Sequence, residues 1–365
     1  MRVLFDGVQA GNRSGTGVYV QEIARHLAVM DDLELHLLWP EGTPAPSVPP
    51  ENVSPVPPGA LARILWQQWT VPALANHLNC DLTHYTASVG SLRQGPANVL
   101  TVHDISFVHA PEWFRKERAL YYRAVVRRSA RNASRIIAVS QATAHDLEEH
   151  WDIDAAKIDV VHNGVDERFQ PVPEGERRRV RERYRLPGNF VLCVATLEPR
   201  KNLARLIEAW AGLAREFPHD LVLAGRDGWK TGPIRAAAAA SGFAERIHFP
   251  GHVDHDDLPA LLSAAAVFAY PSLYEGFGIP VIEAMACGVP VVTSTVSSLP
   301  EVAGDAATLV EPLEVEAIAH GLRRVLADAE LQAVLSAKGL ERAKAFHWRK
   351  SAEGVAATYR KVRST

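Results

Sequence analysis

The sequence has few of the features that mark a secreted, membrane-spanning or disulfide-linked protein. Its 365 residues include three cysteines, Cys80, Cys193 and Cys287, with no spacing typical of a metal site, so we expect buried thiols in a reducing compartment. No segment approaches the ~18 uninterrupted apolar residues of a membrane span, and the first residues lack the apolar core of a signal peptide. A net charge of -3 argues against a globally basic nucleic-acid-binding protein. We therefore expect a cytoplasmic protein without a nucleic-acid partner.

The common nucleotide-binding and metal-binding motifs are also missing. Gly11, Gly15 and Gly17 follow the first apolar strand, but their spacing fits neither a Walker loop nor a dinucleotide fingerprint, which argues against a nucleotide-dependent dehydrogenase. No Asp-x-Asp pair stands out in the place expected to hold a divalent cation for a diphosphate, so we expect no metal and no cofactor. Residues 251–258 are rich in His and Asp, yet Asp254 and Asp257 directly before a helical run are more typical of a helix N-cap than of a metal site.

Apolar runs alternate with helical stretches along the chain, which is typical of parallel sheets covered by helices on both faces. In the first half, the predicted strands are residues 3–5, 33–38, 99–102, 135–139 and 158–162. In the second half, they are residues 190–195, 220–224, 247–249, 267–270, 289–293 and 308–310. This pattern predicts an α/β fold with two Rossmann-like, doubly wound domains.

The length of the chain also favours two domains, since it is too long for one ordinary hydrophobic core. We predict a first domain over residues 1–170, a second over 171–346, and a C-terminal helix over 347–365 that crosses back to the first. A polar, arginine-rich stretch near 168–188 is the predicted linker. The proline-rich segment 42–58 is expected to be an extended surface loop.

Residues 271–290, PSLYEGFGIPVIEAMACGVP, are the most informative segment. They follow the apolar strand 267–270 with a glycine-containing loop and then a helix beginning near Pro280. Glu275 lies before this helix and Glu283 in its first turn, so both can face one cleft at the carboxyl end of the sheet. Carboxylates accept hydrogen bonds from paired sugar hydroxyls, and the loop can offer backbone N–H groups. The alternative is that Glu283 only complements the helix dipole.

This segment resembles the signature of the retaining group 1 glycosyltransferases, which have the two-domain GT-B architecture with a cleft between the domains. Within that family, the chain is similar to the bacterial mannosyl- and rhamnosyltransferase-like branch. Further landmarks in the expected order are GTGVY at 15–19, HD at 103–104, VSQ at 139–141, HNGVD at 162–166, LEPRKNL at 197–203 and SLPEV at 298–302. The similarity covers almost the whole chain.

The resemblance assigns roles to individual residues. It implies that Lys201, with Arg200, neutralises the donor diphosphate, and that the glycine loop with Gly15 and Gly17 closes over it. Many relatives carry Gly-Arg where this chain has Ala195-Thr196, so Arg200 would have to replace that arginine. His103 would face the transferred sugar from the acceptor side.

The remaining assignments concern the signature segment. The resemblance implies that Glu283 binds the ribose hydroxyls of the donor. It also implies that Glu275 and the backbone amides of Gly276, Phe277 and Gly278 bind the hydroxyls of the sugar. Glu275 and Glu283 are therefore not read as the acid and nucleophile of a hydrolase.

The implied function is metal-independent transfer of a hexose, mannose or a related deoxyhexose, from a nucleotide-diphosphate sugar with retention at the anomeric carbon. The similarity favours a GDP-linked donor and a saccharide or lipid-linked saccharide acceptor in the assembly of bacterial surface polysaccharide. A small soluble acceptor is an alternative. A non-catalytic nucleotide-sugar-binding protein of the same fold is the competing function.

An arginine-rich helix is predicted around residues 115–135, with aromatic residues among the basic ones. Such a helix can lie on an anionic membrane surface or contact a diphospholipid acceptor, which would place the protein on the inner face of the cell membrane. A solvated helix face with core aromatics explains the pattern equally well.

Overall fold

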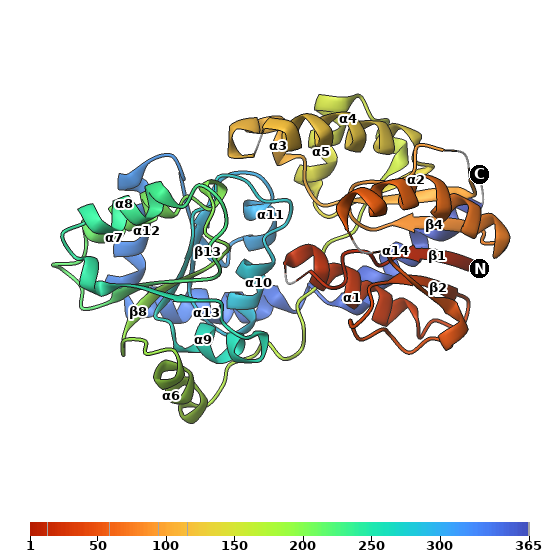
Figure 1. Ribbon diagram of the computed structural model, residues 1–365. Coiled ribbons are helices and arrows are strands. Elements are labelled where there is room, and N and C mark those ends of the chain that lie inside the picture. Colours follow the sequence, from red (N-terminus) through yellow and green to blue (C-terminus); the bar gives the residue numbers. More distant parts are fainter. Residues whose placement is uncertain (13, 58, 94, 115, 364–365) are drawn as a thin grey trace. The chain divides into compact units, whose positions relative to one another are not determined.

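The computed structural model describes residues 1–12, 14–57, 59–93, 95–114 and 116–363. They form two compact units, one made of Met1–Gly164 with the C-terminal segment from His347, and one made of Val165–Phe346. The chain leaves unit 1 at Gly164, where we predicted residue 170. At this point the amide of Val165 donates to the carbonyl of Phe346 (3.1 Å), so the outgoing and returning segments lie side by side. Figure 1 shows the elements of each unit.

Unit 1 is built on a seven-stranded parallel sheet with the order β3-β2-β1-β4-β5-β6-β7. Its strands are β1 (Arg2–Asp6), β2 (Glu34–Trp39), β3 (Val53–Pro55), β4 (Leu82–Tyr85), β5 (Ala97–Val102), β6 (Arg135–Ala138) and β7 (Ile158–Val160). The central strands are buried on both faces, as expected for a parallel sheet: β1 and β5 mainly with aliphatic residues, and β4 with the polar Thr83 and His84 as well.

Helices surround this sheet. They are α1 (Gly15–Leu27), α2 (Ala60–His77), α3 (Ser106–His109), α4 (Lys116–Asn132), α5 (Gln141–Trp151) and α14 (Trp348–Arg363). The short 3-10 turns of unit 1 are η1 (Pro50–Asn52), η2 (Pro111–Trp113) and η3 (Ala155–Lys157). The predicted C-terminal helix, α14, packs beside α1, so the two ends of the chain adjoin within unit 1 (Figure 1).

Unit 2 has a six-stranded parallel sheet with the order β10-β9-β8-β11-β12-β13. Its strands are β8 (Phe190–Val194), β9 (Asp220–Ala224), β10 (Ile247–Gly251), β11 (Val267–Tyr270), β12 (Val291–Ser294) and β13 (Ala307–Val310). All six lie where the sequence predicts them. Two parallel sheets with surrounding helices confirm the predicted α/β class with two Rossmann-like domains.

The helices of unit 2 connect these strands. They are α6 (Glu174–Arg183), α7 (Leu203–Ala211), α8 (Gly232–Ala240), α9 (Leu258–Ala264), α10 (Ile279–Ala286), α11 (Leu299–Ala303), α12 (Val315–Ala327) and α13 (Ala329–Ala343). The 3-10 turns are η4 (Pro199–Lys201), η5 (Ala244–Arg246) and η6 (His255–Asp257).

Three local expectations were wrong. The stretch predicted as a linker contains the helix α6, and the predicted loop 42–58 contains η1 and the edge strand β3. Asp257 does not cap α9 with its side chain; its carboxylate binds Arg179 (2.8 Å) and Arg183 (2.5 Å) of α6. The arginines of α6 therefore hold that helix against α9.

The arginine-rich helix is α4, of which Arg115 and the side chains of Lys116 and Arg118 lie outside the described residues. Phe114 and Tyr122 pack against the core of unit 1, which accounts for two of the aromatic residues of this stretch. Among the described helices, none is long and apolar enough to cross a membrane.

Candidate functional site

Lys201 and Glu275 are brought together by the topology of unit 2. The strand order changes direction between β8 and β11, which pair directly, with Val191 opposite Val267. Doubly wound sheets bind ligands at the carboxyl ends of their strands at such a point. Lys201 ends η4, which follows β8, and Glu275 lies in the loop that follows β11. The two side chains therefore come from loops that leave neighbouring strands.

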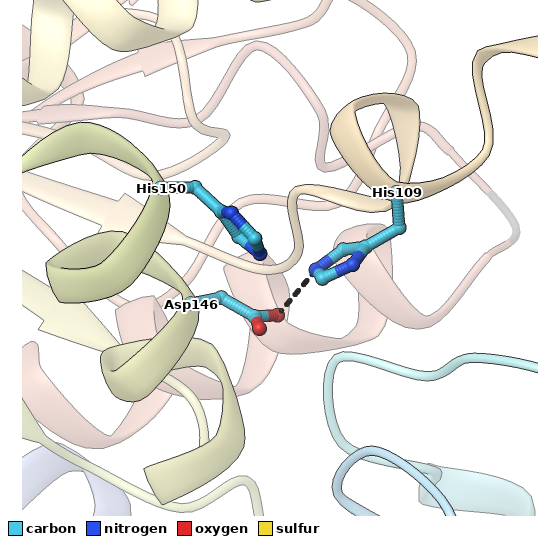
Figure 2. Close-up of side chains that lie close together, drawn as sticks. All are labelled: His109, Asp146 and His150. Carbon is cyan, nitrogen blue, oxygen red and sulfur yellow. Dashed lines mark ion pairs between the residues drawn. The ribbon is translucent and has the colours of Figure 1, made fainter.

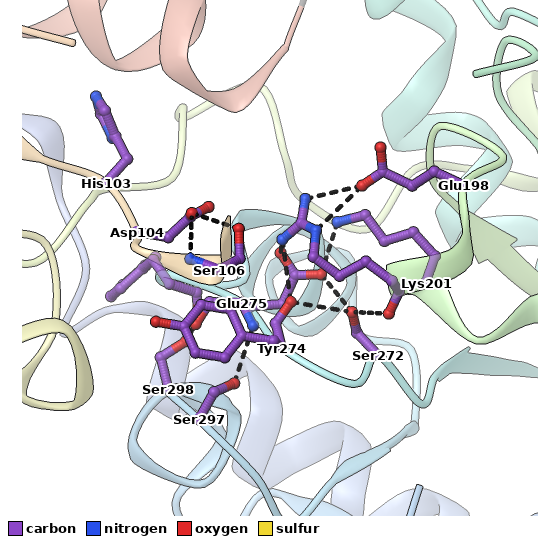
Figure 3. Close-up of polar contacts among 12 residues, drawn as sticks. His103, Asp104, Ser106, Glu198, Lys201, Ser272, Tyr274, Glu275, Ser297 and Ser298 are labelled. Atoms are coloured by element: carbon purple, nitrogen blue, oxygen red, sulfur yellow. Dashed lines mark hydrogen bonds and ion pairs between the residues drawn. The ribbon is translucent and has the colours of Figure 1, made fainter. Parts of the chain in front are cut away.

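The Lys201 ammonium is buried, and Figure 3 shows it beside Glu275. Its Nζ donates to Glu275 Oε1 (2.6 Å) and to the hydroxyl of Tyr270 (2.9 Å). Burial lowers the pKa of Lys201, as does Arg200, while Glu275 opposes that shift. An ammonium has three N–H donors, and these contacts account for two of them.

Arg200 binds the other oxygen of the same carboxylate. Its Nη1 donates to Glu275 Oε2 (2.9 Å) and to the carbonyl of Tyr274 (3.0 Å). Its Nε donates to Glu198 Oε1 (3.1 Å), a buried carboxylate that the sequence analysis did not select. Two cations and two carboxylates thus form one cluster, which fixes the cations before any ligand arrives.

Glu275 is the centre of this cluster. Its Oε1 also accepts hydrogen bonds from Ser272 (2.6 Å) and Tyr270 (3.1 Å). Burial raises the pKa of Glu275, but Arg200 and Lys201 outweigh burial and bring the pKa to about 2. With Oε1 shared by three donors, Oε2 is the oxygen with capacity to accept from a sugar hydroxyl.

The loop from Gly276 to Gly278 is buried and anchored by its carbonyls. Ser298 Oγ donates to the carbonyls of Glu275 and Phe277 (both 2.9 Å). Gly278 has φ +98°, a conformation that disfavours any side chain. The Phe277 ring packs edge-on against Phe346, with centroids 5.6 Å apart, so only the backbone of Phe277 is a candidate for binding.

Glu283 has different surroundings from Glu275. It is buried at the fifth position of α10 and not in the first turn, because the helix begins at Ile279. Burial and the nearby Asp166 raise the pKa of Glu283 to about 8, while Arg168 opposes them. A helix-capping role is excluded by this position, since the dipole acts mainly within the first turn.

In unit 1, His103 follows β5 and is held in one orientation. Its Nε2 lies 2.8 Å from the carbonyl oxygen of Thr86, and its ring packs edge-on against Tyr19 with centroids 4.9 Å apart. A carbonyl only accepts, so Nε2 carries the proton and Nδ1 of the neutral ring is an acceptor. Burial lowers the pKa of His103 and favours this neutral form, against the smaller opposing effects of Thr86 and Asp104.

The glycine loop of unit 1 leads into α1, which begins at Gly15, so Gly15 and Gly17 lie in the first turn of the helix. A Cβ on Gly17 would lie 1.7 Å from the carbonyl oxygen of Asn12, so only glycine fits there. The amides of the first turn, including Gly15 and Gly17, have no partner within the helix. They are available in principle to an anion.

The structure thus joins Lys201, Arg200 and Glu275 in one cluster and adds partners that the sequence analysis missed, namely Tyr270, Ser272 and Glu198. Tyr270 directly precedes the signature segment, Ser272 lies within it, and Glu198 lies next to the turn that contains Arg200. Their position next to selected residues was the signal that could have found them. The shared role of Glu275, as a partner for both cations, was not predicted.

Comparison with known proteins assigns both halves of the chain to related families. Residues 13–169 match the model of Glycosyltransferase Family 4, and residues 176–342 match that of Glycosyl transferases group 1. The solved structure of sucrose-phosphate synthase from Thermosynechococcus elongatus has a TM-score of 0.78 and 22% identity, covering 100% of this chain and 99% of that chain. That likeness concerns the fold alone.

Curated relatives are more similar in sequence. The chain is 34% identical to O-antigen chain mannosyltransferase B of Escherichia coli, over 68% of this chain and 66% of that protein. It is 30% identical to D-inositol 3-phosphate glycosyltransferase of Salinispora tropica, over 96% of this chain and 81% of that protein. It is 33% identical to the serotype-specific mannosyltransferase WbdA of Escherichia coli, over 60% of this chain but 28% of that longer protein. The chain therefore spans less than two thirds of two of these relatives.

Proposed function

The chain belongs to the bacterial group 1 glycosyltransferases, and from that membership we propose that it transfers a hexose from a nucleotide-diphosphate sugar to a saccharide or lipid-linked saccharide. The proposed sugar is mannose or a related deoxyhexose, because two of the relatives that match this chain are named mannosyltransferases. A GDP-linked donor is proposed from the motifs PSLYEGFG and EPRKN. The acceptor is proposed to belong to a surface polysaccharide.

The observation that carries this proposal is the cluster of the buried Lys201 and Glu275 with the half-buried Arg200, at the point where the strand order of unit 2 reverses. A departing nucleotide diphosphate gains negative charge in the transition state. Fixed cations stabilise that charge without reorganising, which is the largest catalytic effect in many enzymes. We propose that Lys201 and Arg200 perform this task without a metal ion, assisted by the first-turn amides of α1 from Gly15 to Gly17.

The remaining roles follow the chemistry of each group. Glu275 Oε2 and the amides of Gly276, Phe277 and Gly278 bind hydroxyls of the sugar, and Glu283 binds the ribose. His103 accepts a hydrogen bond from a sugar hydroxyl at Nδ1, since its Nε2 is engaged.

The reaction is proposed to proceed with retention. The bond from the anomeric carbon to the diphosphate oxygen breaks, and the acceptor oxygen bonds to the same face of that carbon. The acceptor's proton passes to a phosphate oxygen of the departing diphosphate. No protein nucleophile takes part, which fits the pairing of the Glu275 carboxylate with Lys201 and Arg200.

The reaction is proposed to take place in the cytoplasm, with peripheral contact to the membrane through α4. The exposed arginines Arg123, Arg128 and Arg131 support that contact, since basic side chains are attracted to anionic lipids. Mixing with vesicles that contain anionic lipid, and then sedimenting them, tests it. Binding that is lost on replacement of these arginines supports the contact, and equal sedimentation of the variant overturns it.

The transfer proposal is tested by measuring thermal stability and nucleotide diphosphate release with GDP-mannose, UDP-glucose and ADP-glucose. GDP-mannose should raise the melting temperature most, because a ligand that binds the native state stabilises it. Release with a saccharide acceptor should proceed without added Mg²⁺ or Mn²⁺, and NMR of the product should show the donor's anomeric configuration.

A variant separates transfer from mere binding. His103→Ala should lower turnover about 100-fold while GDP-mannose still stabilises the protein, and the exposed His77→Ala should behave like the wild type. Donor binding without release under any condition would leave a non-catalytic binding protein. If none of the donors stabilises the protein, the proposed function is wrong.

A further inference from the structure

Three potential metal ligands converge in unit 1, and none of them is among the residues assigned above. Figure 2 shows His109, Asp146 and His150 with their side chains directed toward one another. One ligand atom of each lies within 4.8 Å of those of the other two. His109 Nε2 is 3.1 Å from Asp146 Oδ2, and the two imidazole rings stand edge-on with centroids 4.7 Å apart.

Two helices supply these groups. Asp146 and His150 are one turn apart on α5, so they share a face of that helix. His109 is the last residue of α3, the short helix that follows the loop of His103. Two imidazole nitrogens and a carboxylate oxygen are a ligand set that suits zinc, and pairing i with i+4 on a helix is a common way to present two of them.

We propose that His109, Asp146 and His150 bind one divalent transition-metal ion, with Zn²⁺ as the best match, and that the ion ties α3 to α5. Three protein ligands leave a fourth tetrahedral position for water. All three ligands belong to unit 1, whereas Lys201, Arg200 and Glu275 belong to unit 2. The inference does not depend on the proposed transferase activity.

The geometry requires little change to accept an ion. Ligand atoms around tetrahedral zinc are about 3.3 Å apart, given bond lengths near 2.0–2.1 Å. The pair of His109 and Asp146 already lies near that spacing, and His150 offers a ring nitrogen within 4.8 Å of both. His109 and His150 are exposed, so an ion can enter from solvent. Asp104 and Glu149 add negative charge around His109, which favours a cation.

The ion would act by positioning. Asp104 Oδ1 accepts hydrogen bonds from the amide (3.0 Å) and hydroxyl (2.6 Å) of Ser106, at the start of α3. A metal bound at His109 would fix the other end of α3 to α5. The segment that begins at His103 would then be restrained on both sides, although the ion touches no substrate.

Metal content tests the proposal directly. Full-length protein without a histidine tag is loaded with Zn²⁺ at mildly alkaline pH, since imidazoles bind metals in the neutral form. It is then dialysed against metal-free buffer and analysed by mass spectrometry for metals. The wild type should retain about one zinc per chain. Co²⁺ in its place should give the visible absorption of a tetrahedral site.

Matched variants decide whether these residues are the ligands. His109→Ala, His150→Ala and His150→Gln should lose the retained zinc, with circular dichroism confirming that each is folded. His145→Ala, an exposed histidine on the same helix that pairs with Glu149, should retain it. A wild type that emerges free of zinc overturns the proposal and leaves His109 and Asp146 as a simple ion pair. Equal retention by all four variants also overturns it.

Discussion

Glu275 and Glu283 are two buried carboxylates in one short segment, and their environments drive them to opposite protonation states. Burial raises the pKa of both. Around Glu275, Arg200 and Lys201 outweigh burial and bring the pKa to about 2. Around Glu283, Asp166 adds to the effect of burial and Arg168 opposes it only in part, so the pKa rises to about 8.

Burial acts on both carboxylates in the same direction, so the difference between them comes from the two cations that bind Glu275 and outweigh burial there, whereas burial prevails at Glu283. Glu275 is a fixed anion whose first task is to hold two cations, which limits it to accepting hydrogen bonds. Glu283 is a neutral acid at neutral pH, so it can both donate to and accept from the ribose hydroxyls that we assign to it. Divergent pKa values in neighbouring acids are typical of functional sites.

Removing a cation from Glu275 should have the largest effect. In Lys201→Met, the buried Glu275 carboxylate keeps Arg200 as a partner but loses the lysine. This should lower the free energy of unfolding by about 3 kcal/mol. Transfer should fall about 100-fold through loss of a diphosphate-binding cation. Urea unfolding and nucleotide release measure the two effects.

The matched control for that variant is Lys338→Met, an exposed lysine that pairs with Asp305. It should leave both quantities near wild-type values. Combining Lys201→Met with Glu275→Gln should restore part of the stability, because the uncompensated charge is gone. If the loss of unfolding free energy in the double variant equals the sum of the losses in the two single variants, Lys201 and Glu275 are not coupled.

Replacing Glu283 should change how stability depends on pH. Its folded-state pKa of about 8 lies above the ordinary value of 4.5, so the folded state binds the proton more tightly. Wild-type stability from this group is therefore lost as pH rises from 4.5 toward 8, by about 1 kcal/mol per pH unit. Glu283→Gln should remove that loss, so the stability of the variant relative to the wild type should increase as pH rises.

Thermal unfolding between about pH 5 and about pH 8 checks this prediction. The exposed Glu316→Gln on α12 is the control and should show no growing advantage. A Glu283→Gln variant that falls further behind the wild type as pH rises would mean that Glu283 is ionised in the folded protein.

A smaller effect is expected for Ser272→Ala. The hydroxyl donates to Glu275 Oε1 at 2.6 Å, so its removal should cost about 1 kcal/mol. Stability from Glu275 is present above pH 4.5 and is lost as pH falls toward 2. Without the hydrogen bond from Ser272 the folded-state pKa of Glu275 is higher, so the variant should lose less stability in total and complete that loss at higher pH. Acid unfolding followed by circular dichroism measures the shift. An unchanged acid limb would show that the cations alone set this pKa.

Arg168→Gln should have the smallest effect. Arg168 lowers the pKa of Glu283 and pairs with Asp166, which raises it, so both consequences of the change push that pKa upward. Arg168 is partly exposed, and the shift should be a fraction of a pH unit in a titration of Glu283. Arg324→Gln, with the same change of charge on the exposed face of α12, should leave the titration unaltered.

The sequence predicted the strands that carry continuous apolar runs, including all six of unit 2. It missed β3 and β4 for physical reasons. β3 is a short edge strand in a proline-rich segment, and β4, Leu82–Tyr85, mixes polar and apolar residues that are buried by tertiary packing. The helix α6 was missed because its charged sequence gains a partner only when α9 packs against it.

The identity of the candidate site residues was predictable where a sequence motif contains them. Their hydrogen-bond partners and protonation states were not predictable, because tertiary contacts determine both. Lys201 and Glu275 were selected, but their bond of 2.6 Å depends on β8 lying beside β11, which the order of the chain does not reveal. The opposite pKa shifts of Glu275 and Glu283 likewise depend on which side chains surround them. In the sequence alone, Glu275 and Glu283 are both glutamates, so nothing local distinguishes their pKa values.

The most direct test is an NMR titration of protein labelled with ¹³C at the glutamate side-chain carboxyl carbon, with Glu275→Gln and Glu283→Gln to assign the two signals. The account predicts that the Glu283 signal titrates near pH 8 and that the Glu275 signal stays in its ionised position as far down as the protein remains folded. Two signals that both titrate near the ordinary value of 4.5 would contradict it.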